Sequence, residues 1–244
     1  EQDSGAGLDR LRRAGIGVTV GVSGEAAEAL DPAYFHHRRT GRALLTQKLA
    51  VTLDGVSAAD DGSSQWITGP AARQDGHRLR AEADAVLVGA GTLRADDPRL
   101  DVRLDGYDGP QPRPVVVAGR ERLPEGSKAA GRGALVIATE PRGGWETIVV
   151  PGEDGLPDPL SVAQALGDAG LLSVLSEAGA RLAGALWRAG ATTRAVLYLA
   201  PRMAGGAGRS AFTGPIPTIA DLSDGSVTDT RTIGSDLRIT FERT

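Results

Sequence analysis

The stretch "ADAVLVGAGTLRADDP", residues Ala83 to Pro98, carries the pattern that decides the fold. Its apolar run is continuous rather than alternating, which is typical of a strand buried on both faces. Gly89 and Gly91 follow the run at once, and a short helix is expected to begin at Thr92. A buried strand that passes through a glycine turn into a helix is the repeating unit of a parallel sheet.

The same arrangement recurs along the chain. In "LLSVLSEAGARLAGALWRAG", residues 171–190, an apolar strand leads through small residues into a helix that ends at Gly190. Other apolar runs predict further strands, and "DPLSVAQALGDAG" predicts a helix over 158–170. These expected strands cover residues 43–53, 113–119, 133–140, 146–152 and 193–201. The alternation predicts an α/β fold with a mostly parallel central sheet and helices on both faces.

The flanking segments complete the expected layout. A helix over 8–14 and a strand over 18–22 come first, and Asp31-Pro32 interrupts or caps a helix within 24–42. A helix is expected from Pro70 to about residue 82, with Thr68 as its N-cap. The tail 236–244 alternates enough to predict a last edge strand. Ligands of such sheets bind at the carboxyl ends of the strands.

Composition limits the function classes. The chain has 244 residues, a net charge of -4 and a pI of about 5.5, which disfavours nucleic acid and anionic membranes as partners. It has no cysteine, so disulfides, cysteine-ligated zinc and thiol nucleophiles are excluded. No apolar run approaches the ~20 residues of a membrane span, and the cytoplasm is the expected compartment. The chain starts with Glu1, and its one methionine is Met203, which indicates a processed or partial product.

Two turns are candidates for binding an anionic ligand. After Gly89 and Gly91, and again after Gly179, a helix start offers backbone N–H groups to a phosphate. The first turn lacks the third glycine of a G-x-G-x-x-G fingerprint, so ordinary dinucleotide binding of the Rossmann type is not supported. Glu177, at a strand end, could orient or protonate a polar ligand. The alternative is a plain strand-end turn with a surface carboxylate.

A few polar side chains suit a phosphorylated substrate. Lys48 lies within an apolar strand and must either reach solvent or point into a polar cavity. Arg80 and Arg103 flank the first glycine turn, and the guanidinium fork suits a phosphate monoester. Ser64 and Trp66 lie in a Gly/Ser-rich loop, where Trp66 would either form an apolar wall for a cofactor or pack the loop onto the sheet.

Other polar groups predict less. The segment "HHRRTGR", residues 36–42, is either a phosphate patch or a solvated connection, and His77 reads as a surface or packing residue. The aspartate pairs at 60–61 and 96–97 lack further ligands, so no metal site is predicted. No motif of a serine hydrolase, zinc protease or P-loop is present.

Six segments in order resemble one family. They are "KLAVTLDG" (48–55), "GSSQWITG" (62–69), "RLRAEADAVLVGAGTLRADDPRLDVR" (78–103), "QPRPVVVAG" (111–119), "SVLSEAGARLAGALWRAG" (173–190) and "LYLAPRMAGG" (197–206). Together they are similar to the reductase domain of the bifunctional riboflavin-biosynthesis deaminase–reductase, from about residue 41 to the end. The resemblance implies a dihydrofolate-reductase-like fold, and it is far more specific than one glycine turn.

The resemblance implies NADPH-dependent reduction of 5-amino-6-(5-phosphoribosylamino)uracil at C1 of its ribose, by a homodimer. It places Ser64, Arg80, Leu100, Arg103 and Glu177 on the substrate. With the glycines of the first turn, it gives a cofactor set of Ala50, Trp66, Gly89, Gly91, Thr92, Asp96, Gly179, Ala180, Arg181, Leu182, Ala183, Gly184 and Ala185. Lys48 and Glu177 are the candidates for proton movement.

The chain also departs from the family pattern. Ala178-Gly179-Ala180 replaces a more glycine-rich turn, and Ala118-Gly119 lacks an expected aspartate, which weakens a cofactor contact there. Residues 1–40 resemble the tail of a deaminase domain with a linker, ahead of a reductase domain over 41–244. Without cysteine this chain cannot hold a deaminase zinc site. Two alternatives remain open: a related reductase of another pterin or pyrimidine, and a non-catalytic nucleotide-binding module.

Overall fold

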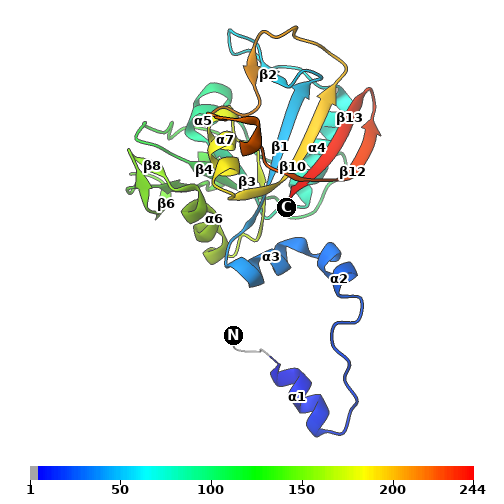
Figure 1. The fold of residues 1–244 in the computed structure, drawn as a ribbon. Coiled ribbons are helices and arrows are strands. Elements are labelled where there is room, and N and C mark those ends of the chain that lie inside the picture. The colour runs from blue at the N-terminus through cyan, green and yellow to red at the C-terminus, as the bar shows by residue number, and fades with distance from the viewer. Residues whose placement is uncertain (1–4) are drawn as a thin grey trace.

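A nine-stranded sheet forms the centre of the computed structural model, which describes residues 5–244 (Figure 1). Its strands are β1 (Leu44–Thr52), β3 (Ala85–Gly89), β4 (Arg113–Val117), β5 (Leu135–Ala138), β6 (Glu146–Val149), β9 (Ser173–Ser176), β10 (Thr192–Ala200), β12 (Gly225–Ile233) and β13 (Asp236–Arg243). They lie in the order β12-β13-β10-β1-β9-β3-β4-β5-β6. Every neighbouring pair from β10 to β6 is parallel, whereas β13 runs antiparallel to both β10 and β12. The predicted mostly parallel sheet is confirmed.

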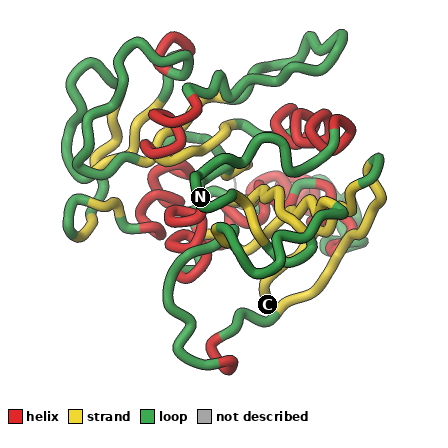
Figure 2. The backbone as a smooth tube through the Cα atoms, turned by 90° about the horizontal axis from the view of Figure 1, so that it is seen from above, coloured by secondary structure: helices red, strands yellow, loops and turns green. Residues whose placement is uncertain are grey.

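Helices cover both faces of this sheet, as predicted (Figure 2). The strands are apolar on both sides: within β3, Leu87 packs into one core cluster while Val86 and Val88 pack into another. α6 (Pro159–Asp168) and α7 (Ala180–Arg188) bury apolar side chains against the Leu87 face. α4 (Pro70–Ala81) and α5 (Ala90–Asp96) contribute to clusters that include Val86, Val88 and Tyr198. Burial of apolar area on two faces supplies the main stabilisation of the layers.

Three helices precede the sheet: α1 (Ala6–Arg13), α2 (Gly24–Leu30) and α3 (Pro32–Thr40). The expected interruption at Asp31-Pro32 is confirmed, because the Asp31 carboxylate accepts a hydrogen bond from the Tyr34 amide and caps α3. The strand predicted over 18–22 is wrong. Val20 and Val22 are 63% and 72% exposed and have no neighbouring strand to pair with. α1 buries no residue and lies away from the sheet in Figure 1.

One predicted helix cap and one predicted helix start differ from the structure. The N-cap of α4 is Gly69, and no side chain caps it, so the predicted Thr68 cap is wrong. The buried Thr68 instead uses its carbonyl oxygen to accept from Arg73, and Asp236 accepts from the Gly69 amide. Similarly, α5 begins at Ala90 rather than Thr92, because Gly89 already has the extended backbone of an N-cap.

The last strand is not at the edge of the sheet. β13 lies between β10 and β12, and β12 forms the edge, which corrects the sequence prediction. β12 reads "GSVTDTRTI" and is largely exposed, so it lacks the apolar signal by which the other strands were predicted. Gly234, at φ +64°, makes the tight connection between the two strands.

Short elements complete the chain. β2 (Val56–Ala58) pairs with β11 (Arg209–Ser210), and β7 (Gly152–Glu153) pairs with β8 (Leu156–Pro157). Single 3-10 turns lie at Ala130–Arg132 and Ile219–Asp221. Between residues 5 and 244, no helix combines the length and the apolarity that crossing a bilayer requires.

Candidate active site

Two turns meet at the carboxyl edge of the sheet. β9 and β3 pair in parallel, and the Glu177 amide donates to the Leu87 carbonyl at 2.8 Å, so the β9–α7 and β3–α5 turns lie side by side. A Cβ placed on Gly179 would lie 3.5 Å from Thr92 Oγ1 of the other turn. The start of α7 has no side-chain cap, so its first amides remain free for an anion. The geometry brings the two candidate anion sites together into one.

A buried polar brace supports the β9–α7 turn from below. Gln47, in the middle of β1, is fully buried; its Oε1 accepts from Ser176 Oγ at 2.7 Å. Its Nε2 donates to the carbonyl oxygens of Lys48 at 3.1 Å and Ala178 at 3.4 Å. This brace was not predicted from the sequence, although a glutamine inside an apolar run is a usable signal, because buried amides need partners.

An ion pair joins α4 to the end of β9. Arg80 Nε and Nη2 donate to the two Glu177 oxygens at 2.7 and 2.8 Å, and Nη1 donates to the Asp101 carbonyl at 2.9 Å. The two side chains are 13% and 17% exposed, so the pair lies almost out of water. Three of the five N–H groups of Arg80 are thus used inside the protein, which leaves two for a ligand.

The protonation state of Glu177 follows from this pair. Burial by itself would raise the pKa of the carboxyl, but the charge and hydrogen bonds of Arg80, followed by the charge of Lys48 and that of His77 in its protonated form, lower that pKa to about 2. Glu177 is therefore a carboxylate at neutral pH. It can accept a hydrogen bond and orient a polar group, and it has no proton to give.

Residues 99–103 form the other side of the Arg80 guanidinium. The Asp101 carboxylate accepts from Arg99 Nε and from Arg103 Nη1, each at 2.7 Å. Leu100 is 1% exposed, belongs to a core cluster and has a left-handed φ of +55°. Its side chain anchors the segment, so contact with a ligand would have to come from its backbone. The structure gathers four of the predicted substrate residues here: Arg80, Leu100, Arg103 and Glu177.

Lys48 lies next to this cluster. Its Nζ is 5.8 Å from the centroid of the Tyr198 ring, and its Cε faces Gly76 of α4. Its charge contributes to the lowered pKa of Glu177, which places the ammonium and the carboxylate in each other's field. The predicted apolar-strand lysine therefore turns toward α4 and the carboxylate.

Ser64 and Trp66 lie in the exposed loop after β2. Trp66 is 61% exposed, and its ring lies 4.5 Å from the Arg73 guanidinium carbon, while its carbonyl accepts from Arg202. This exposure does not fit the reading in which Trp66 packs the loop onto the sheet. Ser64 is also exposed, and no hydrogen bond in the described chain joins it to Arg80.

The remaining predicted cofactor residues divide into accessible and buried groups. Ala50 lies toward the carboxyl end of β1, and Gly91 and Arg181 are exposed at the turns, while Asp96 is exposed at the far end of α5. Ala183 belongs to the core, and a Cβ on Gly184 would lie 2.3 Å from the Thr213 carbonyl oxygen. The positions 183 and 184 therefore face the protein interior rather than the space in front of the two turns. In the described part of the chain, no three metal-ligating side chains gather at one point.

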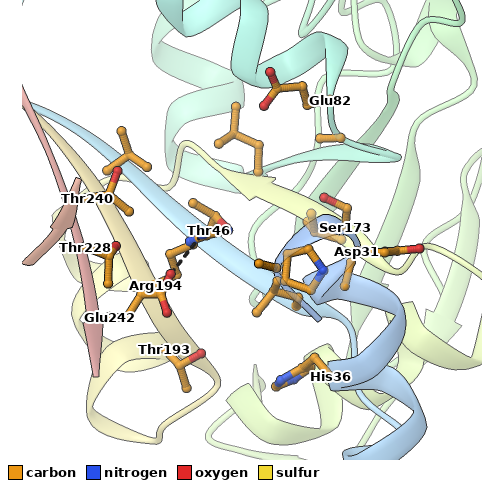
Figure 3. A pocket seen from close by; sticks show the side chains of 18 of the residues that line it. Asp31, His36, Thr46, Glu82, Ser173, Thr193, Arg194, Thr228, Thr240 and Glu242 are labelled. Atoms are coloured by element: carbon orange, nitrogen blue, oxygen red, sulfur yellow. Dashed lines mark ion pairs between the residues drawn. The ribbon is translucent and has the colours of Figure 1, made fainter. Parts of the chain in front are cut away.

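A large groove lies at the other end of the sheet. It has a volume of about 1320 Å³ and runs between α3, the start of β1, the end of α4 and strands β10 and β13 (Figure 3). Arg194 and Glu242 form a 2.8 Å ion pair within it, and His36 lines it. Arg39 of the basic segment pairs with Glu28. This groove is separate from the glycine turns.

Comparison with known proteins gives concordant matches. A family model described as the RibD C-terminal domain matches residues 43–237. The riboflavin biosynthesis protein RibD of Mycobacterium tuberculosis is 42% identical over 230 residues, covering 93% of this chain and 60% of that protein. The Escherichia coli RibD is 32% identical over 255 residues, covering 97% of this chain and 70% of that protein. The chain thus spans about 60% of the length of the mycobacterial relative.

Solved structures agree with the fold. Acinetobacter baumannii RibD superposes with a TM-score of 0.88 at 30% identity, covering 98% of this chain and 69% of that one. The riboflavin biosynthesis reductase Rib7 of Saccharomyces cerevisiae has a TM-score of 0.64 at 20% identity, covering 84% of this chain and 91% of that one. The second similarity shows a shared fold.

Proposed function

The chain belongs to the RibD C-terminal domain family, and from that membership we propose that it is the pyrimidine reductase of riboflavin biosynthesis. Its reaction is the NADPH-dependent reduction of 5-amino-6-(5-phosphoribosylamino)uracil to the ribitylamino product. The observation that carries the proposal is the Arg80–Glu177 pair beside two joined glycine turns. It puts a fixed carboxylate and a set of anion-binding amides at one edge of the sheet.

The two turns fit a dinucleotide. A Cβ on Gly91 would meet open space, and Gly179 lies at the junction of the turns, so a diphosphate can approach the backbone there. The uncapped start of α7 offers it free amides. Gly89 instead leaves room for the Leu182 side chain of α7. Trp66 presents an exposed aromatic face from the neighbouring loop. When bound, NADPH supplies the hydride, and most of the protein's contribution is positioning.

The substrate side is assigned to the α4 cluster. Glu177, ionised and held on two oxygens by Arg80, accepts hydrogen bonds and fixes the orientation of the reacting ribose. Arg103, Ser64 and the free N–H groups of Arg80 suit the substrate phosphate. Because Glu177 holds no proton at neutral pH, Lys48 is the group that delivers the proton at the ribose oxygen or imine nitrogen.

Turnover with defined cofactors tests the function. We expect oxidation of NADPH with the phosphoribosylamino-uracil substrate, a much slower reaction with NADH, and weak activity toward the unphosphorylated analogue. Equal activity on that analogue would favour a related pterin or pyrimidine reductase. Tight NADPH binding without turnover would favour a non-catalytic module. Normal single-turnover hydride transfer in both Lys48→Ala and Glu177→Gln would remove the proposed roles of these residues.

The assembly and the location are also proposals. From the family membership we propose a homodimer, and the groove near α3 is the candidate contact face. Residues 41–244 would form the reductase domain, with residues 1–40 as a tail and linker, and no deaminase activity in this chain.

The acidic balance fits a cytoplasmic enzyme that binds neither nucleic acid nor membrane. Sedimentation of the purified chain tests the dimer, and cell fractionation tests the compartment.

A further inference from the structure

His77 lies on α4 one turn before Arg80, so the two side chains share a helix face. The backbone N–H of Arg103 donates to His77 Nδ1 at 3.2 Å. Arg80 Nη1 donates to the Asp101 carbonyl at 2.9 Å. Two neighbouring side chains of one helix thus hold two nearby backbone groups of the same segment.

The side chain of Arg103 depends on this backbone attachment. Its guanidinium is 55% exposed, and its ion-pair partner is Asp101 of the same segment. Leu100 anchors one end of the segment in the core, while the His77 hydrogen bond holds the other end at Arg103. Without that bond, the described hydrogen bonds would link this segment to α4 only through Asp101, while Gln111 holds Val102 from outside the helix.

We propose that His77 is a positioning residue of the reductase, which as a neutral imidazole fixes segment 100–103, and with it Arg103, against the Arg80–Glu177 pair. The proposal rests on the proposed function, and it assigns to His77 a role in holding the phosphorylated substrate. His77 touches neither substrate nor cofactor in this scheme. It acts through the backbone of Arg103.

The role requires Nδ1 to be free of a proton. A protonated imidazole has two N–H donors and no acceptor, so it cannot take the hydrogen bond from Arg103. Burial, followed by the charges of Arg80 and Arg103, lowers the pKa of His77 below its ordinary 6.5, while Glu177 and the Asp101 backbone act in the opposite direction. The contact is therefore complete at neutral pH and is lost as the pH falls through the lowered pKa.

Three substitutions separate the acceptor from the bulk of the ring. In His77→Asn the amide oxygen occupies the place of Nδ1, so we expect the wild-type KM for the phosphorylated substrate. In His77→Leu and His77→Gln no acceptor stands there. We expect that KM to rise about tenfold, the size of one lost hydrogen bond, with kcat within about twofold and NADPH affinity unchanged.

The pH profile supplies a readout that a merely structural role would not move. In the wild type the substrate KM should rise as the pH falls through the lowered pKa of His77, because protonation removes the acceptor. His77→Asn should abolish this rise. As a matched control, His37→Asn on α3, where the imidazole contacts Arg38, should keep both the wild-type KM and the wild-type profile.

Amide hydrogen exchange at Arg103 makes the test independent of turnover. We expect that amide to exchange faster in His77→Leu than in the wild type and in His77→Asn. The melting temperature of His77→Leu should remain that of the wild type. An unchanged KM and unchanged exchange in His77→Leu would overturn the proposal. Exchange that responds as expected in a protein without reductase turnover would instead overturn the proposed function and leave the positioning contact established.

Discussion

The two turns at the carboxyl edge of the sheet have the same local sequence pattern and different support. Gln47 and Ser176 brace the β9–α7 turn from below, and Arg80 holds its glutamate from the side. In the described chain, no side-chain hydrogen bond reaches residues 89–92 of the β3–α5 turn. A Cβ on Gly91 would meet open space.

The difference matches what each turn has to present. In the proposed function, the β9–α7 turn carries the carboxylate that orients the substrate, and side chains from two other elements fix its direction. The β3–α5 turn presents only backbone and small residues to a ligand, and helix packing is enough for that. Polar side chains brace the β9–α7 turn, which is proposed to orient the substrate through a charged group. The described part of the β3–α5 turn, which is proposed only to bind a ligand through its backbone, has no such brace.

Removal of the Glu177 carboxylate from the β9–α7 turn should have the largest effect on stability and activity. Glu177→Ala leaves Arg80 nearly buried without its counter-ion, so we expect a loss of about 3–5 kcal/mol in the free energy of unfolding. We also expect kcat/KM to fall by at least about a hundredfold. Urea denaturation and steady-state kinetics measure the two effects. A loss below about 1 kcal/mol would mean that the pair is effectively solvated.

Acid should weaken the same pair. The pKa of Glu177 is lowered to about 2 from an ordinary 4.5, so its stabilisation is complete above pH 4.5 and is lost as the pH falls through 2. The stability difference between wild type and Glu177→Gln should therefore shrink from pH 7 to pH 3. Melting curves of both proteins across this range measure it, and a constant difference would contradict the assigned pKa.

The brace beneath the turn should come next in size. Gln47→Leu leaves the Ser176 hydroxyl and the Ala178 carbonyl without their partner, which we expect to cost about 1–3 kcal/mol. The double variant Gln47→Leu/Ser176→Ala removes both polar side chains and should recover part of that stability. We expect the KM for NADPH to rise in Gln47→Leu and to stay raised in the double variant, because the turn lacks its brace in both. If both the free energy of unfolding and the KM for NADPH returned to wild-type values, Gln47 and Ser176 would contribute only to core packing.

Single methyl groups on the turns should have the smallest effects on stability. Gly91→Ala, at an exposed helical position, should change stability by at most about 1 kcal/mol in the favourable direction. Gly179→Ala should be nearly neutral for folding and should raise the Kd for NADPH, because its methyl would stand 3.5 Å from Thr92 Oγ1. Calorimetric titration with NADPH compares the two. Equal affinities would place the cofactor away from the junction of the turns.

The sequence predicted the parts of the fold that continuous apolar runs encode. β3, β4, β5, β9 and β10 all follow such runs, while the polar β12 was missed and residues 18–22 were predicted as a strand that has no partner. Local pattern shows whether a segment is apolar, and tertiary contacts decide whether it pairs.

The site was predicted as residues and not as contacts. Glu177 and Arg80 were both singled out, but they lie 97 positions apart, and no local pattern encodes their pairing. His77 looked like a surface or packing histidine, because the Arg103 backbone that it meets is 26 residues away. The strand that contains Gln47 was predicted correctly from its apolar residues, but its partners at the β9–α7 turn lie more than 100 residues away and were not predicted.

The position of β1 has a consequence for how the chain folds. β1 pairs with β9 and β10, whose residues begin at 173 and 192, so the centre of the sheet is built from contacts far apart in sequence. Such contacts slow folding, because a long loop must close before they form. During synthesis, one edge of β1 stays unpaired until about residue 176 has left the ribosome, and the other edge until about residue 200. Over that interval β1 is open to pairing with strands of other molecules, and chaperones that shield apolar strands would act on this protein there.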